Sequence, residues 1–422
     1  MDFFEHLKRD DLHKVRYPFV SRATKWTDRL VAGYLKRFNG NIAPMKPVAL
    51  VNDMPVYDLT QPPIGSEAGT RVLKVGFDYM VLKKQARPIN MVVMINDACD
   101  MNCTHCSAQN YMKHGKKPMS YQVLRDLVDQ FIEMGGASFV ISGGEPTLYK
   151  KLLKLIDETD KSKVAVSMFT NGSRVSDLAT ELRSVGLFGT LVSLDSNDPA
   201  VHDRRRGFDG AFKRALKAIE TLKANEMLVG ISTYISRFGM KKGSFEQVIA
   251  LGEDLGVDQV FCFDAVPTGA LMHGDDWVLT LEDREILKEM IKAQNASPSG
   301  PAVMGQSWVN SPEGIGCFAG FYQIYVTAAG DVCPCDFTPI TFGNVCDEPL
   351  QTIWDRMRAS ADWGPRFHSC RMQDKCFRAK TVDLIPPGTA FPVPYETILK
   401  LQKEKDTRHC EPHTESSQIM EG

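Results

Sequence analysis

The sequence of 422 residues lacks a long apolar run, and no stretch approaches the roughly 18 consecutive apolar residues of a membrane-spanning helix. Its first residues, MDFFEHLKRDDLHK, are charged where a secretory signal peptide would be apolar. An excess of either charge is also lacking, because 50 Lys and Arg residues stand against 52 Asp and Glu residues. This balance argues against a chain that coats nucleic acid. We therefore expect a cytoplasmic protein that does not bind nucleic acid.

Cysteine, in contrast, is abundant, with 11 residues. Disulfides explain them poorly, because the cytoplasm is reducing and an odd number cannot pair completely. Three of them, Cys99, Cys103 and Cys106, lie in MINDACDMNCTHCSAQ with the spacing C-x3-C-x2-C. Thiolates this close in a loop suit an iron–sulfur cluster. Zinc, which usually takes a fourth protein ligand in a closed site, and plain packing stay as alternatives.

Residues 89–270 alternate between apolar, β-branched runs and amphipathic helical segments. Six runs have this character: 89–97, 137–144, 163–172, 189–196, 228–236 and 257–266. Such alternation predicts βαβ units around a parallel sheet that is buried on both faces. Six successive units predict an α/β fold, a partial (β/α)6 barrel similar to a TIM barrel. Chemistry in such folds lies at the C-terminal strand ends, and the cysteine loop follows the first strand.

The residues before the barrel, 1–88, are expected to form a helical and β-hairpin extension. Within it, residues 1–45 interleave cations with aromatic and aliphatic side chains at helical spacing. A helix of this kind packs on the barrel or rests as a peripheral contact on an anionic membrane surface. The segments KPVALVNDMPVYDL and TRVLKVGFDYMVL are predicted to be short strands joined by turns.

Three further segments follow the barrel. Residues 271–316 are expected to be a connector with one helix, LEDREILKEMIKAQ, and a loop, NASPSGPAVMG. Residues 317–385 hold six cysteines and several turn signals, which predicts a small cysteine-rich α+β module. Residues 386–422 are expected to be a C-terminal extension that ends in a polar tail.

The cysteine loop after the first strand resembles the radical S-adenosylmethionine (SAM) superfamily. The segment SGGEPTL at the end of the second strand resembles the GGEP motif of that family, with Gly143, Gly144, Glu145 and Pro146. The resemblance implies that Cys99, Cys103 and Cys106 bind a 4Fe–4S cluster and leave one iron open for SAM. It also implies that the backbone and carboxylate of the GGEP motif hold the SAM amino group, where glycines permit close approach.

Polar residues end the third and fourth strands, where the family places side chains around the ribose and methionyl groups of SAM. These residues are Asn171 in TNG and Ser193 and Asp195 in VSLDS. A strand-end turn or helix cap is the alternative for each. His105, just before the third cysteine, is expected to shield the cluster.

The second cysteine group resembles the SPASM module, which carries auxiliary 4Fe–4S clusters in many radical SAM enzymes. Its matching cysteines are Cys317, Cys335, Cys370 and Cys376. The match is incomplete, because Phe367 and Lys380 stand where further cysteines are expected. The resemblance therefore implies one auxiliary cluster, as in the shortened twitch-like modules. Cys333 or Cys346 could replace one ligand, and a structural zinc site is the alternative.

The resemblance implies an enzyme that reductively cleaves SAM to a 5′-deoxyadenosyl radical and abstracts a hydrogen atom from its substrate. It implies oxidation, cross-linking or another modification of a peptide, a lipid or a small molecule, with flavodoxin or ferredoxin as electron donor. The sequence names no catalytic acid, base or hydrogen donor. A non-catalytic iron–sulfur or zinc-binding scaffold is the alternative, although a scaffold has no need of a GGEP motif beside an incompletely ligated cluster.

Overall fold

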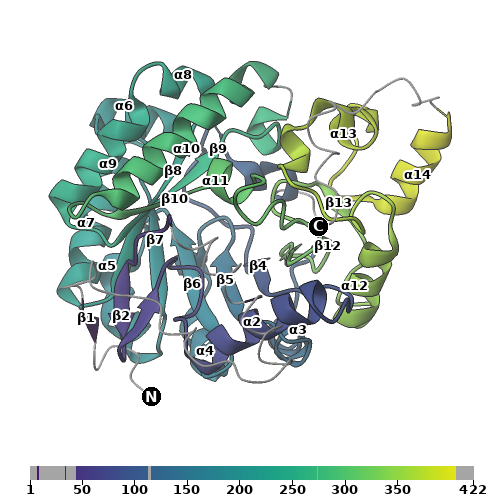
Figure 1. Ribbon diagram of the computed structural model, residues 1–422, viewed down its shortest axis with the longest axis horizontal. Helices are drawn as coiled ribbons and strands as arrows, with labels where there is room; N and C mark the ends of the chain where they lie inside the picture. The colour runs from purple at the N-terminus through teal and green to yellow at the C-terminus, as the bar shows by residue number, and fades with distance from the viewer. Residues whose placement is uncertain (1–6, 9–33, 35–43, 113–115, 273, 405–422) are drawn as a thin grey trace.

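The computed structural model describes residues 7–8, 34, 44–112, 116–272 and 274–404. Most of the basic segment expected over residues 1–45, its predicted membrane contact, and Cys410 in the tail therefore lie outside the described residues. Figure 1 shows a barrel of strands wrapped by helices, with the C-terminal segments gathered beside it. No helix in the described part of the chain is long and apolar enough to cross a membrane.

Within the described residues, nine strands form the central sheet, in the order β10-β9-β8-β7-β6-β5-β4-β11-β12. The six expected barrel strands are present, and each pairs in parallel with the next. They are β4 (Asn90–Met94), β5 (Ser138–Ser142), β6 (Ala165–Thr170), β7 (Gly189–Ser193), β8 (Leu228–Ile235) and β9 (Gln259–Asp264). This topology confirms the predicted partial (β/α)6 barrel.

Amphipathic helices cover the outside of the barrel (Figure 1). In α3 (Tyr121–Glu133), the Ser120 side chain accepts a hydrogen bond from the Val123 backbone and caps the helix, and an apolar face including Leu127 and Phe131 is buried. Each such side chain contributes about 1.5–3 kcal/mol when fully buried. The other helices of the barrel are α4 (Leu152–Glu158), α5 (Val175–Ser184), α6 (Pro199–Arg206), α7 (Ala211–Ala224), α8 (Arg237–Met240) and α9 (Ser244–Leu255).

The sheet continues beyond the six barrel strands on both sides. β10 (Ala302–Gly305) pairs in parallel with β9, so the loop predicted over NASPSGPAVMG is wrong for its last four residues. Four residues between Pro301 and a helix are too few to show a strand pattern, and only pairing with β9 orders them as a strand. The predicted connector helix is present as α10 (Leu281–Ala296), and α11 (Gln306–Val309) follows β10.

On the other side of the barrel, β11 (Gln323–Val326) pairs in parallel with β4. β12 (Val332–Cys333) then pairs antiparallel with β11. The C-terminal module therefore shares the barrel's sheet. It also contains β13 (Ile340–Thr341), α12 (Leu350–Ala359) and α13 (Lys375–Ala379). In the C-terminal extension, β14 (Val393–Pro394) pairs in parallel with β13, and α14 (Tyr395–Glu404) follows it.

The N-terminal extension contains the expected hairpin and an unexpected helix. β2 (Ala49–Val51) and β3 (Met54–Val56) pair antiparallel, and β1 (Leu7–Lys8) pairs with β2. The segment TRVLKVGFDYMVL lies mostly in helix α2 (Glu67–Met80), so its prediction as a strand is wrong. Its valines suggested a strand, but the Ser66 side chain caps the helix, and Val75 packs with Phe321 of the C-terminal module. Tertiary packing thus overrides the β preference of these valines.

A segment between β3 and α2 forms the floor of the barrel. The Leu59 backbone N–H donates to Gln259 at the start of β9 (3.0 Å), and its carbonyl accepts from Ser167 of β6. The Leu59 side chain is fully buried, and a Cβ atom on Gly189 would lie 2.5 Å from its carbonyl oxygen. Leu59 therefore closes the barrel at the N-terminal ends of the strands.

Short 3-10 turns complete the described structure: η2 (Ser107–Tyr111), η3 (Pro146–Leu148), η4 (Gly269–Leu271), η5 (Asp275–Trp277), η6 (Arg371–Gln373) and η7 (Val382–Leu384). Barrel and C-terminal module share one apolar core, which includes Phe131 of α3 and Trp354 of α12. Trp354 also donates its indole N–H to the Ala86 carbonyl at 3.0 Å. The domain boundaries drawn from the sequence stay predictions.

Candidate functional site

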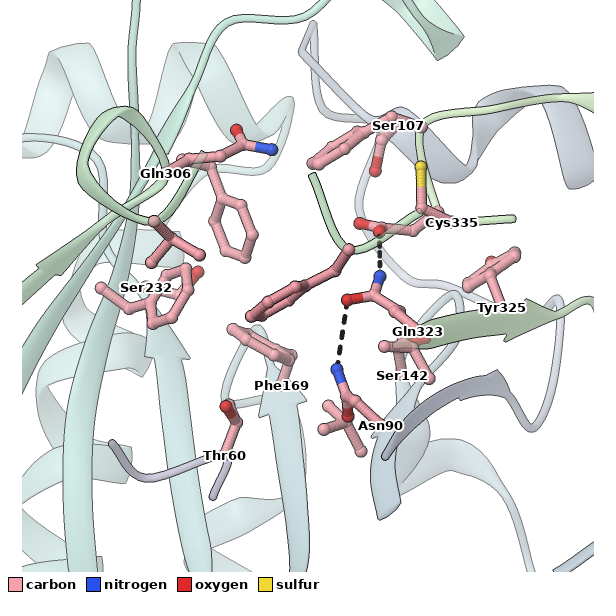
Figure 2. Close-up of a pocket in the computed structure, with 18 of the residues that line it drawn as sticks. Thr60, Asn90, Ser107, Ser142, Phe169, Ser232, Gln306, Gln323, Tyr325 and Cys335 are labelled. Carbon is pink, nitrogen blue, oxygen red and sulfur yellow. Dashed lines mark hydrogen bonds between the residues drawn. The ribbon is translucent and has the colours of Figure 1, made fainter. Parts of the chain in front are cut away.

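One cavity of about 890 Å³ joins the two cysteine groups. Figure 2 shows part of its lining, where Phe169, Ser232 and Gln306 of the barrel face Gln323, Tyr325 and Cys335 of the module. Six of the seven cysteines predicted as ligands line it: Cys99, Cys103, Cys106, Cys317, Cys335 and Cys370. The fold therefore brings two groups of thiols that are far apart in sequence to one space at the C-terminal ends of the strands.

Backbone hydrogen bonds hold the first cysteine loop on two sides. The backbone N–H groups of Asn102 and Thr104 donate to carbonyls at the end of α6, at 3.1 and 2.9 Å. On the other side, the Ala270 N–H donates to the Cys106 carbonyl at 3.1 Å. A Cβ atom on Gly269 would lie 2.1 Å from that carbonyl, so the loop after β9 needs glycine to approach so closely. These contacts hold the three cysteines in a fixed loop.

Burial is the largest influence on the pKa of these three thiols. It raises the pKa of Cys99 to about 11, and it also raises the pKa of Cys103 and Cys106. The thiols are therefore protonated at neutral pH without a ligand. Because only thiolates bind metal, ligation must displace these protons.

The two glycines of the GGEP motif lie directly against the cysteine loop. A Cβ atom on Gly144 would lie 2.3 Å from the Ala98 carbonyl oxygen, and one on Gly143 would lie 2.7 Å from Asn96 Oδ1. The Gly144 N–H also donates to the Asn96 carbonyl at 2.9 Å. Both glycines line the cavity, and Pro146 begins η3 behind them. Glycine at these positions therefore allows the end of β5 to approach the cysteine loop.

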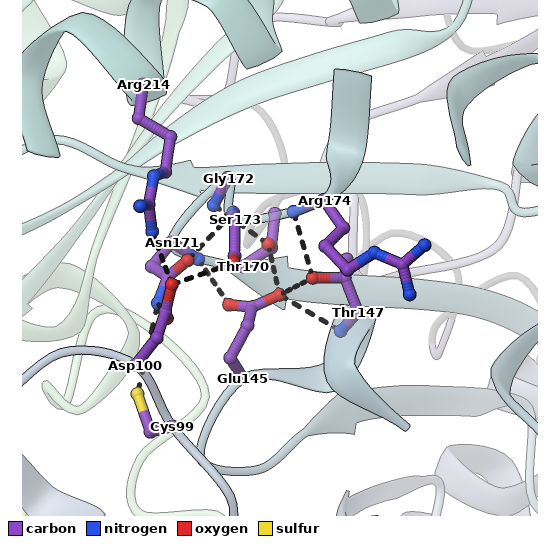
Figure 3. A network of polar contacts seen from close by, with 10 residues as sticks. All are labelled: Cys99, Asp100, Glu145, Thr147, Thr170, Asn171, Gly172, Ser173, Arg174 and Arg214. Atoms are coloured by element: carbon purple, nitrogen blue, oxygen red, sulfur yellow. Dashed lines mark hydrogen bonds and ion pairs between the residues drawn. The ribbon is translucent and has the colours of Figure 1, made fainter. Parts of the chain in front are cut away.

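The Glu145 carboxylate is fully buried and already has four protein donors. Its oxygens accept from the Thr147 N–H (3.0 Å) and hydroxyl (2.6 Å), the Thr170 hydroxyl (2.7 Å) and the Asn171 N–H (2.7 Å) (Figure 3). Burial raises its pKa, and these donors oppose that shift. Glu145 lines the cavity beside the two glycines, and the predicted contact between its carboxylate and SAM stays a prediction.

Asn171 connects Glu145 to the first cysteine. Its side-chain Nδ2 donates to Asp100 Oδ1 at 2.9 Å and lies 3.9 Å from Cys99 Sγ (Figure 3). Asp100 also accepts from the Ser173 hydroxyl (2.8 Å) and pairs with Arg214. Asp100, a residue that sequence reasoning missed, thus ties the cysteine loop to the end of β6 and to α7.

Asp195, at the end of β7, is buried in an ion pair. Its oxygens lie 2.7 and 2.8 Å from Arg206 nitrogens, and Arg206 Nη1 lies 3.9 Å from Cys103 Sγ. This pairing lowers the pKa of Asp195 to about 2, against the effect of burial. His105 lies 3.6 Å from Asp195 and stacks on Tyr234, which suits the predicted shielding role. Ser193 lines the cavity beside them.

Three cysteines of the second group converge. Burial raises the pKa of Cys370 to about 12 and that of Cys335 well above its usual value, and the nearby Cys317 adds to both shifts. Cys376 lies half-buried on α13 and is not among the cavity-lining residues. Cys333 is buried on β12. The fourth ligand of the auxiliary group therefore stays a prediction among Cys376, Cys333 and the exposed Cys346.

The sequence did not indicate the two walls of the cavity between the cysteine groups. One wall is aromatic, with Phe169, Phe261, Phe263 and Phe337 in successive ring contacts 4.7–6.3 Å apart. The other is polar: Asn90 donates to Gln323 and Gln323 donates to Asp336, each at 3.2 Å (Figure 2). Burial raises the pKa of Asp336 to about 6. These residues come from distant segments, so no local pattern marks them.

Comparison with known families identifies two regions of the chain. Residues 93–255 match the radical SAM superfamily, and residues 317–379 match SPASM, an iron–sulfur cluster-binding domain. Within the described residues, no group of three or more His, Cys, Asp or Glu side chains lies close enough to hold a single metal ion. Three thiols around the cavity with glycine backbone beside them nevertheless suit a cluster with one open iron.

Relatives of known function are 24–25% identical to the chain over the aligned residues. The AdoMet-dependent heme synthase of Methanosarcina barkeri is 24% identical over 61% of this chain and 79% of its own. The subtilosin biosynthesis protein AlbA of Bacillus subtilis is 24% identical over 68% of this chain and 65% of its own. The mycofactocin maturase MftC of Mycolicibacterium smegmatis is 25% identical over 63% and 70%.

A solved structure shows the same fold. SuiB of Streptococcus suis, bound to its precursor peptide SuiA, superposes with a TM-score of 0.53 at 18% identity over 68% of each chain. Family matches, relatives and fold agree with the cysteine groups and the glycine motif. The chain therefore belongs to the radical SAM superfamily as a SAM-dependent enzyme with a C-terminal SPASM domain, and its cofactors are SAM, a 4Fe–4S cluster and further iron–sulfur in the SPASM domain.

Proposed function

We propose that the protein abstracts a hydrogen atom from a peptide held between its two cysteine groups and completes a net oxidation of that peptide. The cavity shared by both groups is the observation that carries this proposal, because it lets one substrate face both. SAM bound to the cluster of Cys99, Cys103 and Cys106 supplies a 5′-deoxyadenosyl radical when it receives an electron. Flavodoxin or ferredoxin is the proposed source of that electron.

The residues of this chain hold and orient the reactants. The three cysteines of the first loop bind the cluster, and Gly143 and Gly144 let the SAM amino group approach the backbone. Ser193 offers a hydroxyl at the end of β7. The aromatic wall offers an apolar surface to the substrate, and exclusion of water there would protect a radical from side reactions.

Cys317, Cys335 and Cys370, with Cys376, Cys333 or Cys346 as the fourth ligand, hold one auxiliary cluster. SAM held at the first cysteine loop would supply the radical that takes a hydrogen atom from a substrate C–H bond, giving 5′-deoxyadenosine. An auxiliary cluster held by these cysteines would supply the acceptor for the second electron of the oxidation, and the accompanying proton would pass to a base of the chain. Asp264 and Asp336 are the candidate bases, because both carboxylates line the cavity.

A peptide substrate agrees with the relatives and with the polar wall. A precursor peptide is bound in the SuiB structure, and the names of AlbA and MftC describe the biosynthesis of a bacteriocin and the maturation of mycofactocin. The side-chain amides of Asn90, Gln306 and Gln323 line the cavity and can pair with peptide N–H and C=O groups.

A small molecule with carboxylate groups is the second candidate. It is favoured by Arg366, which lines the cavity and could pair with a carboxylate, and by the heme synthase relatives. The lipid alternative depends on residues 1–45, most of which lie outside the described part of the chain.

Anaerobic reconstitution tests the proposal. Iron and sulfide are counted, SAM and dithionite are added, and 5′-deoxyadenosine is measured. About eight irons per chain with 5′-deoxyadenosine would support two 4Fe–4S clusters and SAM cleavage, whereas about four would remove the auxiliary cluster. Zinc in place of iron, with no 5′-deoxyadenosine, would overturn the proposal. Deuterium transfer from labelled peptides into 5′-deoxyadenosine then tests the substrate class.

A further inference from the structure

Two side-chain donors lie at equal distances from two different cysteines of the first loop. Asn171 Nδ2 is 3.9 Å from Cys99 Sγ, and Arg206 Nη1 is 3.9 Å from Cys103 Sγ. N–H groups hydrogen-bond to sulfur at longer distances than to oxygen, and a thiolate attracts them more than a thiol does. Both donors are therefore placed to hydrogen-bond to the sulfur atoms when those atoms bind iron.

A carboxylate orients each donor. Asp100 Oδ1 accepts from Asn171 Nδ2 at 2.9 Å, and Asp100 is fixed in turn by Ser173 and Arg214. Asp195 forms a two-point ion pair with Arg206, at 2.7 and 2.8 Å. Buried carboxylates in such networks hold their partners in one orientation.

These contacts occupy the groups that the sequence assigned to SAM. The Asn171 amide uses its Nδ2 on Asp100, and its Oδ1 accepts from the Ser173 N–H at 2.9 Å. Both oxygens of Asp195 lie against Arg206. Asn171 and Asp195 are thus committed to groups around the cysteine loop.

Hydrogen bonds to cluster sulfur are among the factors that set the reduction potential of an iron–sulfur cluster. Reduction adds negative charge to the cluster, and a donor or a cation beside a ligand sulfur stabilises that charge. Each donor should therefore raise the potential and make the cluster easier to reduce.

We propose that Asn171 and Arg206 are positioning residues that raise the reduction potential of the cluster bound by the first cysteine loop. Asp100 and Asp195 orient these two donors toward the sulfur atoms. This inference rests on the cluster assignment in the proposed function. It gives this network a redox role that is separate from SAM binding.

The test is a redox titration of the reconstituted full-length protein, followed by electron paramagnetic resonance with and without SAM. The variants are Asn171→Ala and Arg206→Gln. Asn225→Ala is the control for the first, because it removes the same kind of side chain from the end of α7, where it is not among the residues that line the cavity. Arg205→Gln is the control for the second, because it removes the same charge from a side chain that bonds the Asp195 carbonyl.

At the potential where half of the wild-type cluster is reduced, we expect the ratio of reduced to oxidised cluster to fall about tenfold in Asn171→Ala and in Arg206→Gln. For a one-electron couple this corresponds to a midpoint lower by about 59 mV. The two controls should titrate like the wild type. Unchanged midpoints in both variants, or equal shifts in the controls, would overturn the inference.

If a variant loses its iron, its midpoint cannot be measured, and a second measurement on the wild type tests whether the two donors bond to the cluster sulfur. In D2O, the reduced cluster should show hyperfine coupling to exchangeable deuterons from these donors, and their absence would also refute the inference. Iron content and 5′-deoxyadenosine formation by the wild type test the proposed function separately. A variant with an unchanged midpoint and weakened SAM binding would instead assign its side chain to SAM.

Discussion

Asn90 of β4 and Gln323 of β11 are register partners in the central sheet, and their side chains hydrogen-bond at 3.2 Å. β4 is the first strand of the barrel, and β11 is the first strand of the C-terminal module. The bond therefore lies where the two parts of the chain join, inside the cavity that both cysteine groups line. Barrel and SPASM domain share backbone pairing as well as a substrate space.

Removal of the C-terminal module should therefore destabilise the barrel. A chain that ends at residue 316 would leave the edge of β4 unpaired and would expose core residues such as Phe131. Unpaired apolar strand edges promote aggregation. We expect this truncation to be recovered mainly as aggregate, as measured by size-exclusion chromatography beside the full-length chain. A soluble, cooperatively folding fragment would show that the barrel is independent.

Replacement of the first cysteine ligand should abolish SAM cleavage. In Cys99→Ala the cluster of the first loop loses one of its three thiolates, so we expect loss of about half of the iron and of all 5′-deoxyadenosine formation. Cys262→Ala is the control, because Cys262 is buried on β9 and is not among the residues that line the cavity. Full activity of Cys99→Ala would refute the assignment of Cys99.

A methyl group on Gly144 should disturb the same site without removing a ligand. Its Cβ would lie 2.3 Å from the Ala98 carbonyl and 3.0 Å from the Cys99 Cβ. We expect Gly144→Ala to weaken SAM binding at least tenfold, because the cysteine loop must move away from β5. Equilibrium binding of SAM to the reconstituted protein measures this.

Gly252→Ala on the outer helix α9 is the matched control for Gly144→Ala. Its added methyl group would meet only side-chain carbons, at 3.0 Å or more. SAM affinity in that control should equal that of the wild type. Equal affinity in Gly144→Ala would contradict the packing argument.

Asp58, beside the barrel floor, should make stability depend on pH. Burial raises its pKa above the usual 3.8, although hydrogen bonds from Thr60 oppose the shift. The folded state thus holds this proton more tightly than the unfolded state. The protonated Asp58 carboxyl contributes most to the free energy of unfolding below pH 3.8, and this contribution is lost as the pH rises through the raised pKa. The free energy of unfolding falls by at most about 1.4 kcal/mol per pH unit from this group.

Asp58→Asn removes this titration, so the variant should gain stability over the wild type as the pH rises from 4 to 8. Urea unfolding at several pH values measures the difference, and Asp254→Asn at an exposed position of α9 is the control. A stability difference that stays constant with pH would exclude the buried carboxyl as its cause.

The sequence predicts those parts of the molecule that depend on local pattern. Residues 89–270 alternate apolar runs and amphipathic helices, and all six predicted strands are present. The spacing of Cys99, Cys103 and Cys106 predicts a cofactor loop, because the proposed ligands are neighbours in sequence. The resemblance to the GGEP motif predicts Gly143 and Gly144 at the end of the second strand, where the structure has them.

Features that depend on distant segments could not be predicted. β10 has four residues and is ordered by pairing with β9. In α2, Val75 is buried in one apolar cluster with Phe321, and this packing favours the helix. No local pattern marks Asp100, on which the side chains of Asn171, Ser173 and Arg214 converge. Glu145 matched a family motif, but only the fold shows that four protein donors already surround its carboxylate.

The barrel floor also bears on how the chain is made. Leu59 contacts Gln259, 200 residues later in the sequence, so the floor is synthesised long before the strand it meets. At about 5–20 residues per second, a translating ribosome needs about 10–40 s to span that interval. During this time Leu59 lacks its partner on β9. Contacts between residues so far apart in the sequence form slowly, so this part of the floor stays incomplete while the chain is still on the ribosome.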